Sequence, residues 1–462
     1  MSRFGSSWIV ASLAALLLVV GAAPRDSRAA TYKSIHNFCS RTKCDDGGFP
    51  SSIFADSAGN LYGTAEYGSA NSGGVVFALI QPPAGHTSWT EPVLDRLCTY
   101  PIKPGVCQRG AQPVGVTPDS SGNLFVVASN GGIQNGGTIF KLSPPPVGQA
   151  LWAATPIYKF TGDPGGLHPN GGLVIDSQGN LYGTTQQGGA SNVGLVFELS
   201  PPTAGQTAWT FQELYSFCNC AGGNRPLAGL LMDSAGNLYG TTSTPNVFEK
   251  LTGTVFELSP PSAGQSAWSF HLLYSFCRFS GCRDGAGPEA ALIMDGAGNL
   301  YGTTLFGGVA QTAANNQGGG TVFELSPPSP GSTSWRELVL HSFCSLPNCA
   351  DGELPAASLL FDASGNLYGS TTSGGYAISN SEGPATGTVF KLSRPSAGSS
   401  QWAEIILHRF CALSICDLGG SPLGLTYKGA SSGAPYDGIS PLYGIARSGG
   451  VHGTGTVFQI VP

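Results

Sequence analysis

Short runs of alternating hydrophobic and polar residues recur along the chain, and turns rich in Gly, Pro, Asn and Asp separate them. In the stretch 268–276 every second residue is apolar: Trp268, Phe270, Leu272, Tyr274 and Phe276. This period of two residues predicts a β-strand with one strongly apolar face. Apolar runs at 227–233, 237–242 and 254–258 predict three more strands in the same unit. Because the unit has no helical periodicity, we expect four antiparallel strands and no helix.

This unit recurs along the sequence. A Gly-Asn pair followed by Leu and then Tyr or Phe appears at Asn60, Asn123, Asn180, Asn237, Asn299 and Asn366, and an altered copy surrounds Tyr443. The third strand of each unit carries a Phe after Val or Ile, at Phe77, Phe140, Phe197, Phe256, Phe323, Phe390 and Phe458. Seven units of four strands predict an all-β fold, a seven-bladed β-propeller that forms one domain over residues 31–462. The radial arrangement hides the sheet edges that a long open sheet would expose.

The two ends of the sequence predict how the ring closes. Segment 32–38 is a copy of the fourth strand, whereas the sequence ends at Pro462, just after a third strand. We therefore expect segment 32–38 to pair with segment 456–460. The N-terminal strand would then complete the last blade.

The motifs of the repeat resemble a known bacterial class. They read Leu-Tyr-Gly-Thr-Thr at 238–242 and Gly-Thr-Val-Phe-Glu-Leu-Ser-Pro-Pro at 253–261, and their relatives follow in the same order over nearly all of the chain after residue 30. They are similar to the GloVer-type tandem repeats, or GTVF repeats, of "choice-of-anchor" exported proteins. The resemblance implies export and a β-propeller-like fold, and it implies no particular reaction.

Residues 1–30 have the order of a secretory signal peptide. Arg3 precedes an apolar stretch at 8–23, and the small residues Ala29 and Ala30 lie where cleavage is expected. An uncleaved membrane anchor is the alternative, although the apolar stretch is short for a membrane span. We expect a chain that is secreted or otherwise extracytoplasmic, with no membrane segment once the signal peptide is removed.

The twelve cysteines fall into six close pairs: Cys39/Cys44, Cys98/Cys107, Cys218/Cys220, Cys277/Cys282, Cys344/Cys349 and Cys411/Cys416. Close pairs in an exported chain predict six local disulfides. Metal binding is the competing interpretation, but zinc needs several converging ligands, and no paired His residues lie near these cysteines in the sequence. The pair Cys218/Cys220 is the weakest prediction, because a single intervening residue makes a strained ring.

The composition and the absence of known motifs limit which partners and which reactions the sequence supports. The chain has 21 basic and 27 acidic residues, a net charge of −6 and no basic run, which argues against nucleic acid as a partner. It has no phosphate loop, nucleophile elbow or His-Glu-x-x-His motif. His36, His341 and His408 occupy a position that is Tyr in sister units, which predicts a packing role. We expect a monomer without a resident cofactor or metal.

One face of the predicted ring is a candidate for binding. The loops between second and third strands and those between blades share this face, vary in length and carry the Cys pairs, whereas the turns on the opposite face are nearly identical. A uniform scaffold with one varied face indicates binding at that face. Tolerated insertions are the alternative.

Two sets of residues are candidates on the varied face. Carboxylates just before the inner strands are expected around one mouth of the channel, where they are candidates for Ca²⁺ or a cationic ligand: Asp46, Asp163, Asp284, Asp351 and Asp417. Asp-Gly turn chemistry is the alternative role for this set. Aromatic residues in the loops are candidates for contact with sugar rings: Tyr67, Phe306 and Tyr376.

Together these features predict a secreted, non-catalytic propeller that binds an extracellular protein or glycan on the varied face. The alternative is an extracellular carbohydrate-active hydrolase or lyase that uses carboxylates from different blades, with Glu66 and Glu353 added to the Asp set. No catalytic residue and no metal ligand can be assigned from the sequence.

Overall fold

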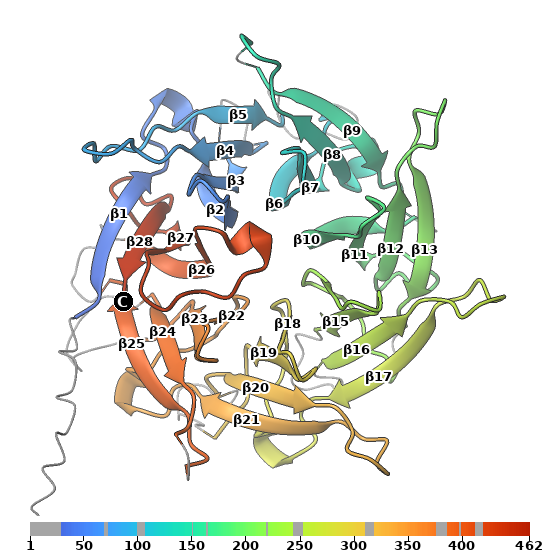
Figure 1. Cartoon of the computed structure of the whole chain (residues 1–462), viewed down its shortest axis with the longest axis vertical. Coiled ribbons are helices and arrows are strands. Elements are labelled where there is room, and N and C mark those ends of the chain that lie inside the picture. Colours follow the sequence, from blue (N-terminus) through green and yellow to red (C-terminus); the bar gives the residue numbers. More distant parts are fainter. Residues whose placement is uncertain are drawn as a thin grey trace, which may run out of the picture.

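The computed structural model describes residues 29–68, 73–98, 107–149, 151–162, 165–218, 220–243, 253–309, 318–375, 386–396, 399–411 and 419–462. In these ranges seven four-stranded antiparallel sheets form a closed ring (Figure 1). The fold is the all-β, seven-bladed β-propeller that the repeats predict. Residues 1–28 of the expected signal peptide lie outside the described part of the chain. Within the described ranges, no helix has the length and apolar character that a membrane span needs.

Each blade runs from an inner strand beside the central axis to an outer strand at the rim. Blade 1 contains β2 (Gly48–Ala55), β3 (Leu61–Tyr67), β4 (Val75–Leu79) and β5 (Val93–Arg96). Blade 2 contains β6 (Ala111–Pro118), β7 (Leu124–Asn130), β8 (Thr138–Ser143) and β9 (Ala153–Lys159). Blade 3 contains β10 (Leu167–Ile175), β11 (Leu181–Gln187), β12 (Leu195–Ser200) and β13 (Thr210–Ser216). Blade 4 contains β14 (Leu231–Met232), β15 (Leu238–Thr242), β16 (Thr254–Ser259) and β17 (Ser269–Ser275).

The second half of the ring follows the same plan. Blade 5 contains β18 (Ile293–Met294), β19 (Leu300–Thr304), β20 (Thr321–Ser326) and β21 (Arg336–Ser342). Blade 6 contains β22 (Leu360–Phe361), β23 (Leu367–Thr371), β24 (Thr388–Ser393) and β25 (Ala403–Arg409). Blade 7 contains β26 (Gly420–Tyr427), β27 (Leu442–Ser448), β28 (Thr456–Val461) and β1 (Thr31–Asn37). Short 3-10 turns lie in the connections: η1 (Thr42–Cys44), η2 (Ile133–Asn135), η3 (Ser280–Cys282), η4 (Pro347–Cys349) and η5 (Ala430–Ser432).

The ring is closed by the N-terminal strand, as the sequence predicts. Strand β1 pairs antiparallel with β28, and Tyr32 lies opposite Ile460. In Figure 1, β1 lies at the rim of blade 7 beside the C-terminal strand. Tyr32 also stacks on His408 of blade 6, with ring centroids 4.0 Å apart and planes at 12°. Strand β1 is therefore held in blade 7 by backbone hydrogen bonds and against blade 6 by side-chain packing.

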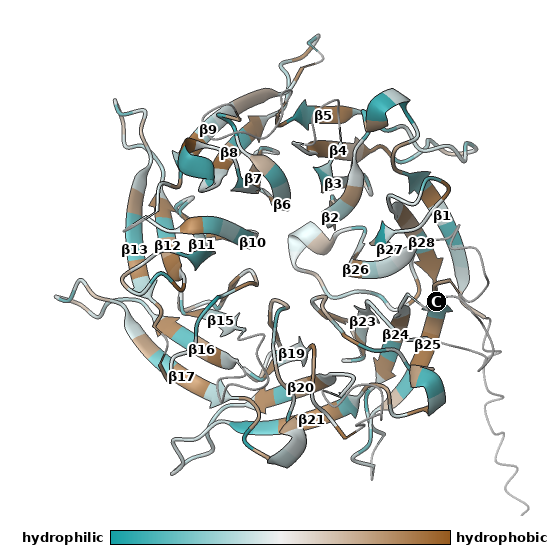
Figure 2. Cartoon of the chain, turned by 180° about the vertical axis from the view of Figure 1, so that it is seen from behind, coloured by the Kyte–Doolittle hydropathy of each residue, from teal (hydrophilic) through white to brown (hydrophobic). Residues whose placement is uncertain are grey.

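The two repeat motifs meet in the core of each blade. The Phe of every third strand is fully buried, and Figure 2 shows hydrophobic residues along third strands such as β12 and β28. In blade 4, Gly240 of the Leu-Tyr-Gly-Thr-Thr motif lies opposite Phe256. A Cβ at Gly240 would lie 2.5 Å from Phe256 Cζ, closer than real Cβ atoms approach other atoms. The glycine thus makes room for the ring that packs against it.

The repeated Asp-x-x-Gly-Asn turn has the structural role that the sequence suggests. In blade 4, Asp233 Oδ1 accepts hydrogen bonds from the backbone N–H groups of Ala235 and Asn237, both at 2.9 Å. Its Oδ2 accepts hydrogen bonds from Asn237 Nδ2 at 2.8 Å and from the Tyr239 hydroxyl at 3.2 Å. Both carboxylate oxygens therefore stabilise the turn between the first two strands by accepting hydrogen bonds.

The inner strands of blades 4 to 6 are shorter than predicted. The sequence predicts a strand over 227–233, whereas β14 contains two residues, Leu231–Met232, and β18 and β22 are equally short. The Leu227 carbonyl instead accepts a hydrogen bond of 2.7 Å from Asn170 Nδ2 of blade 3. At the inner rim, contacts between blades therefore replace part of the pairing within a blade.

The face bearing the uniform turns differs from the prediction in blade 7. There the segment 428–441 replaces the short turn, carries η5 and reaches over the centre of the ring (Figure 1). The Gly429 N–H donates to the carbonyl of Asp56 in blade 1, at 3.2 Å. On the other side, the Tyr436 N–H donates to the Phe361 carbonyl at 3.0 Å, and the Ala363 N–H donates to the Tyr436 carbonyl at 2.8 Å. We call residues 428–441 the plug.

Disulfides close the predicted Cys loops in the described part of the chain. The bonded pairs are Cys39–Cys44, Cys98–Cys107, Cys218–Cys220, Cys277–Cys282 and Cys344–Cys349. The weakest prediction, Cys218–Cys220, is among them. Cys411 is also disulfide-bonded, and its expected partner Cys416 lies outside the described residues. Local disulfides of this kind are typical of proteins in an extracytoplasmic, oxidising compartment.

Candidate functional site

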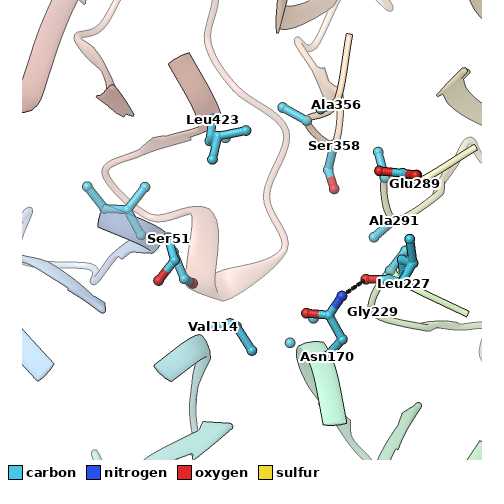
Figure 3. Close-up of a pocket in the computed structure, with 18 of the residues that line it drawn as sticks. Ser51, Val114, Asn170, Leu227, Gly229, Glu289, Ala291, Ala356, Ser358 and Leu423 are labelled. Carbon is cyan, nitrogen blue, oxygen red and sulfur yellow. Dashed lines mark hydrogen bonds between the residues drawn. The ribbon is translucent and has the colours of Figure 1, made fainter. Parts of the chain in front are cut away.

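A cavity with a volume of about 660 Å³ lies at the centre of the ring. Side chains from different blades point into it, among them Ser51, Asn170, Glu289 and Leu423 (Figure 3). Much of its wall consists of small residues at the inner strands: Gly171, Gly172, Gly229, Ala290, Ala291, Ala356 and Ala357. Small residues there keep the centre of the ring open, because a larger side chain would fill it.

Charged residues of both signs line this cavity. Glu66, near the end of β3, and Arg447, near the end of β27, lie where these strands run into loops of the varied face. Arg447 Nη1 and Nη2 donate to Glu66 Oε1 and Oε2 at 2.6 and 2.7 Å, a bidentate pair that joins blade 7 to blade 1. Glu289 accepts a hydrogen bond of 3.0 Å from the Ser243 hydroxyl. Burial raises the pKa of Glu289, against the lowering effects of Ser243 and of the Arg225 charge.

The predicted aromatic contacts do not lie on the cavity wall. Tyr67 is 38% exposed, but its ring packs edgewise on Phe49, and its hydroxyl accepts a hydrogen bond from Gln112 at 3.0 Å. Phe306 is partly buried, and its backbone pairs with Ala286. Tyr376 lies outside the described residues. Among the described residues that line the cavity, none is aromatic.

Three residues of the expected carboxylate ring are described, and the structure does not place them at the channel mouth. Asp46 and Asp351 are fully buried, Asp284 is 1% exposed, and none of them lines the cavity. Each braces the loop that follows its outer strand: Asp351 Oδ2, for example, accepts hydrogen bonds from the backbone N–H and the hydroxyl of Ser345, at 2.8 and 2.7 Å. The physical reason is that these loops fold back on themselves between the blades. Asp163 and Asp417 lie outside the described residues.

Two of the buried Asp residues belong to clusters that span neighbouring blades. Asp46 groups with His36 and Glu91, and Asp351 groups with His341 and Glu404. In each cluster the potential ligand atoms all lie within 4.8 Å of one another. The Glu residue comes from the next blade, two positions after the Trp that precedes the outer strand. Glu337 takes the same position beside Asp284, where the third residue is Tyr274.

Burial controls the ionisation of these clusters. Burial raises the pKa of Glu91 to about 7, although the nearby Arg41 charge lowers it. Burial and the adjacent Asp351 carboxylate raise the pKa of Glu404 to about 8, against the lowering effect of the Arg409 charge. Burial lowers the pKa of His36 to about 4 and also lowers that of His341, against the opposing effect of the neighbouring Asp. Each cluster therefore favours a neutral imidazole.

At two other blade junctions an aromatic ring takes the position of the Glu residue. Phe211 stacks on Tyr158 with centroids 4.7 Å apart, and Phe270 stacks on Tyr215 at 4.2 Å. Equivalent positions therefore hold stacked aromatic rings at some blade junctions and clusters of titratable groups at others. Sequence reasoning missed Glu91, Glu337 and Glu404. A Trp-x-Glu triplet in the sequence marks these three residues. The triplet occurs three times, each time in the unit after a Cys loop that ends with one of the buried Asp residues: Asp46, Asp284 and Asp351.

The sequence comparison bears on the repeat itself. Residues 99–314 match the Gloeobacter/Verrucomicrobia repeat family. The match spans somewhat less than half of the chain and runs from the end of the first unit into the fifth. The resemblance of the repeat motifs to a bacterial repeat class is confirmed in this coarser form. No curated protein is significantly similar to the sequence.

The likeness to a solved structure with a TM-score of 0.50 supports the fold alone. The chain is similar to a structure described as the extracellular domain of a hybrid two component system from B. thetaiotaomicron, with a TM-score of 0.50 and 14% sequence identity. The alignment covers 94% of this chain and 42% of that chain, so the present chain spans less than half the length of that structure. An oxidoreductase described as a glucose dehydrogenase, from Thermus thermophilus, aligns with a TM-score of 0.41 and 14% identity over 74% of this chain and 94% of that chain.

Proposed function

We propose that this protein is a secreted, non-catalytic binding propeller that holds a charged segment of an extracellular protein in its central cavity. The observation that carries the proposal is the cavity of about 660 Å³, lined by Glu66, Arg447, Glu289 and Arg225 among small residues. A site with both signs of charge complements a partner that also carries both signs, as a polypeptide does. Glycan is the less favoured ligand, because the described wall of the cavity offers no aromatic ring for a sugar to stack on.

The position of the cavity supports binding from the varied face. The charged pair Glu66 and Arg447 lies where β3 and β27 run into loops of this face. On the opposite face, the plug reaches over the centre of the ring and is hydrogen-bonded to the turns of blades 1 and 6. A ligand would therefore approach from the face with the Cys loops. Apart from the plug, this geometry is consistent with a scaffold that keeps one face uniform and varies the other.

Binding can be tested with two ligand libraries and one pair of variants. The purified chain is screened against a random peptide display library and a glycan array. Arg225 lines the cavity and its side chain is exposed, so Arg225→Glu reverses a charge without removing a core contact. The matched control is Arg336→Glu, which changes an exposed residue on the outer strand β21. The selected peptides should bind at least about tenfold more weakly to Arg225→Glu and equally well to the control.

The same screen separates the alternatives. Peptide binding that Arg225→Glu leaves unchanged would place the site elsewhere on the surface. Specific binding of glycans without peptides would replace the protein partner by a sugar. Turnover of a bound glycan would favour the hydrolase or lyase. Secretion is tested independently by N-terminal sequencing of the exported chain, which should begin at Ala30 or Thr31.

A further inference from the structure

The junction between blades 5 and 6 holds a cluster whose chemistry the binding function does not use. His341 lies on β21 of blade 5, Asp351 lies in the loop between the blades, and Glu404 lies on β25 of blade 6. We propose that these three side chains bind a divalent transition metal ion, with zinc as the ion that their ligand set fits best. One imidazole and two carboxylates are ligands that zinc takes in proteins.

The spacing of the ligand atoms suits an ion better than direct hydrogen bonds. His341 Nε2 lies 3.9 Å from Asp351 Oδ2 and 3.8 Å from Glu404 Oε2. Hydrogen bonds between such atoms are shorter, about 2.7 to 3.2 Å. Atoms bound to one zinc ion at about 2.1 Å lie roughly 3.4 to 3.8 Å apart, depending on the angle at the metal. The imidazole therefore needs to approach each carboxylate by only a few tenths of an ångström, and the two carboxylate ligand atoms lie within 4.8 Å of each other.

The buried polar atoms of the cluster point to a missing partner. His341 Nε2 and Glu404 Oε1 are both inaccessible to solvent, and neither has a hydrogen-bond partner in the part of the protein that the structure describes. The side chains of His341, Asp351 and Glu404 are 14%, 1% and 11% exposed. Buried polar atoms are nearly always paired, so each unpaired atom calls for a physical explanation. A metal ion bound by His341 Nε2 and by both carboxylate oxygens of Glu404 would satisfy both atoms at once.

Charge balance also favours a dication. The carboxyl group of Asp351 accepts hydrogen bonds from Ser345 and Leu346. Within the described residues, no Lys or Arg lies within ion-pair distance of Asp351 or Glu404. Two carboxylates, a neutral imidazole and a divalent cation form a neutral assembly, which avoids the large cost of burying an uncompensated charge.

The equivalent junctions provide internal comparisons. Where Tyr274 replaces His, its hydroxyl reaches Asp284 directly and donates a hydrogen bond of 2.9 Å. Where His36 takes the position, Arg41 Nη2 lies 2.7 Å from Glu91 Oε2 and supplies a positive charge. The cluster of His341 has no such phenol, and Arg409, whose charge acts on Glu404, makes no ion pair with it in the described part of the chain. We therefore assign the ion to this junction.

The test counts metal ions on the full-length chain after export. The protein is stripped with a chelator, incubated with zinc chloride, passed through a desalting column and analysed by inductively coupled plasma mass spectrometry. The loss variants are His341→Tyr, which installs the residue found in sister units, and Glu404→Gln, which keeps the side-chain shape. The control is His36→Tyr, which makes the same change at the junction where Arg41 provides the charge. Circular dichroism and melting temperature verify the fold of each variant.

We expect the wild type and His36→Tyr to retain about one zinc ion per chain, and both loss variants to retain at least roughly tenfold less. Cobalt(II) should give the wild type a visible absorption spectrum of a low-coordinate site with nitrogen and oxygen ligands, and His341→Tyr should lack it. Zinc should raise the melting temperature of the wild type but not that of His341→Tyr. Folded wild type that retains no zinc, or that retains as much as His341→Tyr does, overturns the proposal.

Discussion

Tyr436 of the plug packs edgewise on Tyr368 of blade 6, with ring centroids 5.2 Å apart and planes at 88°. Both rings are fully buried. A second contact joins Tyr436 to Tyr427 at the end of β26, with centroids also 5.2 Å apart. Together with its backbone hydrogen bonds to blade 6, this residue anchors the plug over the centre of the ring.

Tyr436→Ala should release the plug. Loss of the buried ring should cost about 3 kcal/mol, the low end of the range for large-to-small changes at aromatic core positions. Trypsin cleavage after Lys428, at the start of the plug, should then be roughly a hundredfold faster, because cleavage follows the population of the open segment. The control is Ile439→Ala in the same segment, where the side chain is 75% exposed. Equal cleavage rates in the two variants would show that Tyr436 does not hold the plug.

The contact between Gly240 and Phe256 predicts the cost of adding a methyl group. Gly240→Ala places a Cβ 2.5 Å from Phe256 Cζ, so the ring or the backbone must shift. We expect a loss of about 1 to 3 kcal/mol in the free energy of unfolding, measured by chemical denaturation. Gly296→Ala is the matched control, because no atom lies within 4 Å of its added Cβ and its φ is not positive. That variant should stay within about 0.5 kcal/mol of the wild type.

The buried carboxyl of Glu337 predicts a pH dependence of stability. Burial and the neighbouring Asp284 raise the pKa of Glu337 to about 7, above the value of 4.5 expected in the unfolded chain. Between these values the folded state holds a proton that the unfolded state has lost, so this group's stabilising contribution is full below pH 4.5 and is lost as the pH rises through 7.

Glu337→Gln keeps a neutral side chain at every pH and serves as the reference. Relative to this variant, the wild type should lose free energy of unfolding as the pH rises from 4.5 toward 7, and the difference should level off above that value. Tyr274 and Asp284 are the titratable neighbours, and both remain in the variant. A difference that does not change over this interval would mean that Glu337 ionises normally in the folded protein.

The sequence predicted the parts of the fold that depend on local pattern. Alternation at 268–276 and the recurring Phe after Val or Ile led to four strands per blade and seven blades, and the copy of the fourth strand at 32–38 led to the closed ring. These features repeat, so each unit supports the interpretation of the next. The inner strands were predicted less well, because hydrogen bonds between blades, such as that from Asn170 to Leu227, leave no local pattern.

The site was harder to predict, because it depends on contacts between distant segments. The buried Asp residues were recognised as a set, but their place between blades depends on loop folding that the sequence does not show. Glu404 reaches His341 only because consecutive blades pack side by side. The plug was missed for a different reason: it occurs once, so no repeat marks it. A segment that occurs only once in a repeat protein is the hardest to predict, because the repeat pattern gives no second copy to compare it with.

Hydrogen exchange at β1, measured by mass spectrometry on the native protein, tests the closed ring most directly. Pairing of Thr31–Asn37 with β28 predicts that the amides of β1 exchange within about tenfold of those of β17, the outer strand of blade 4. Lys33→Ala, at an exposed position of β1, should leave this protection unchanged, whereas Tyr32→Ala should weaken it. Amides of β1 that exchange at the rate of an unfolded peptide, while β17 and β28 stay protected, would show that the N-terminal segment does not close the ring.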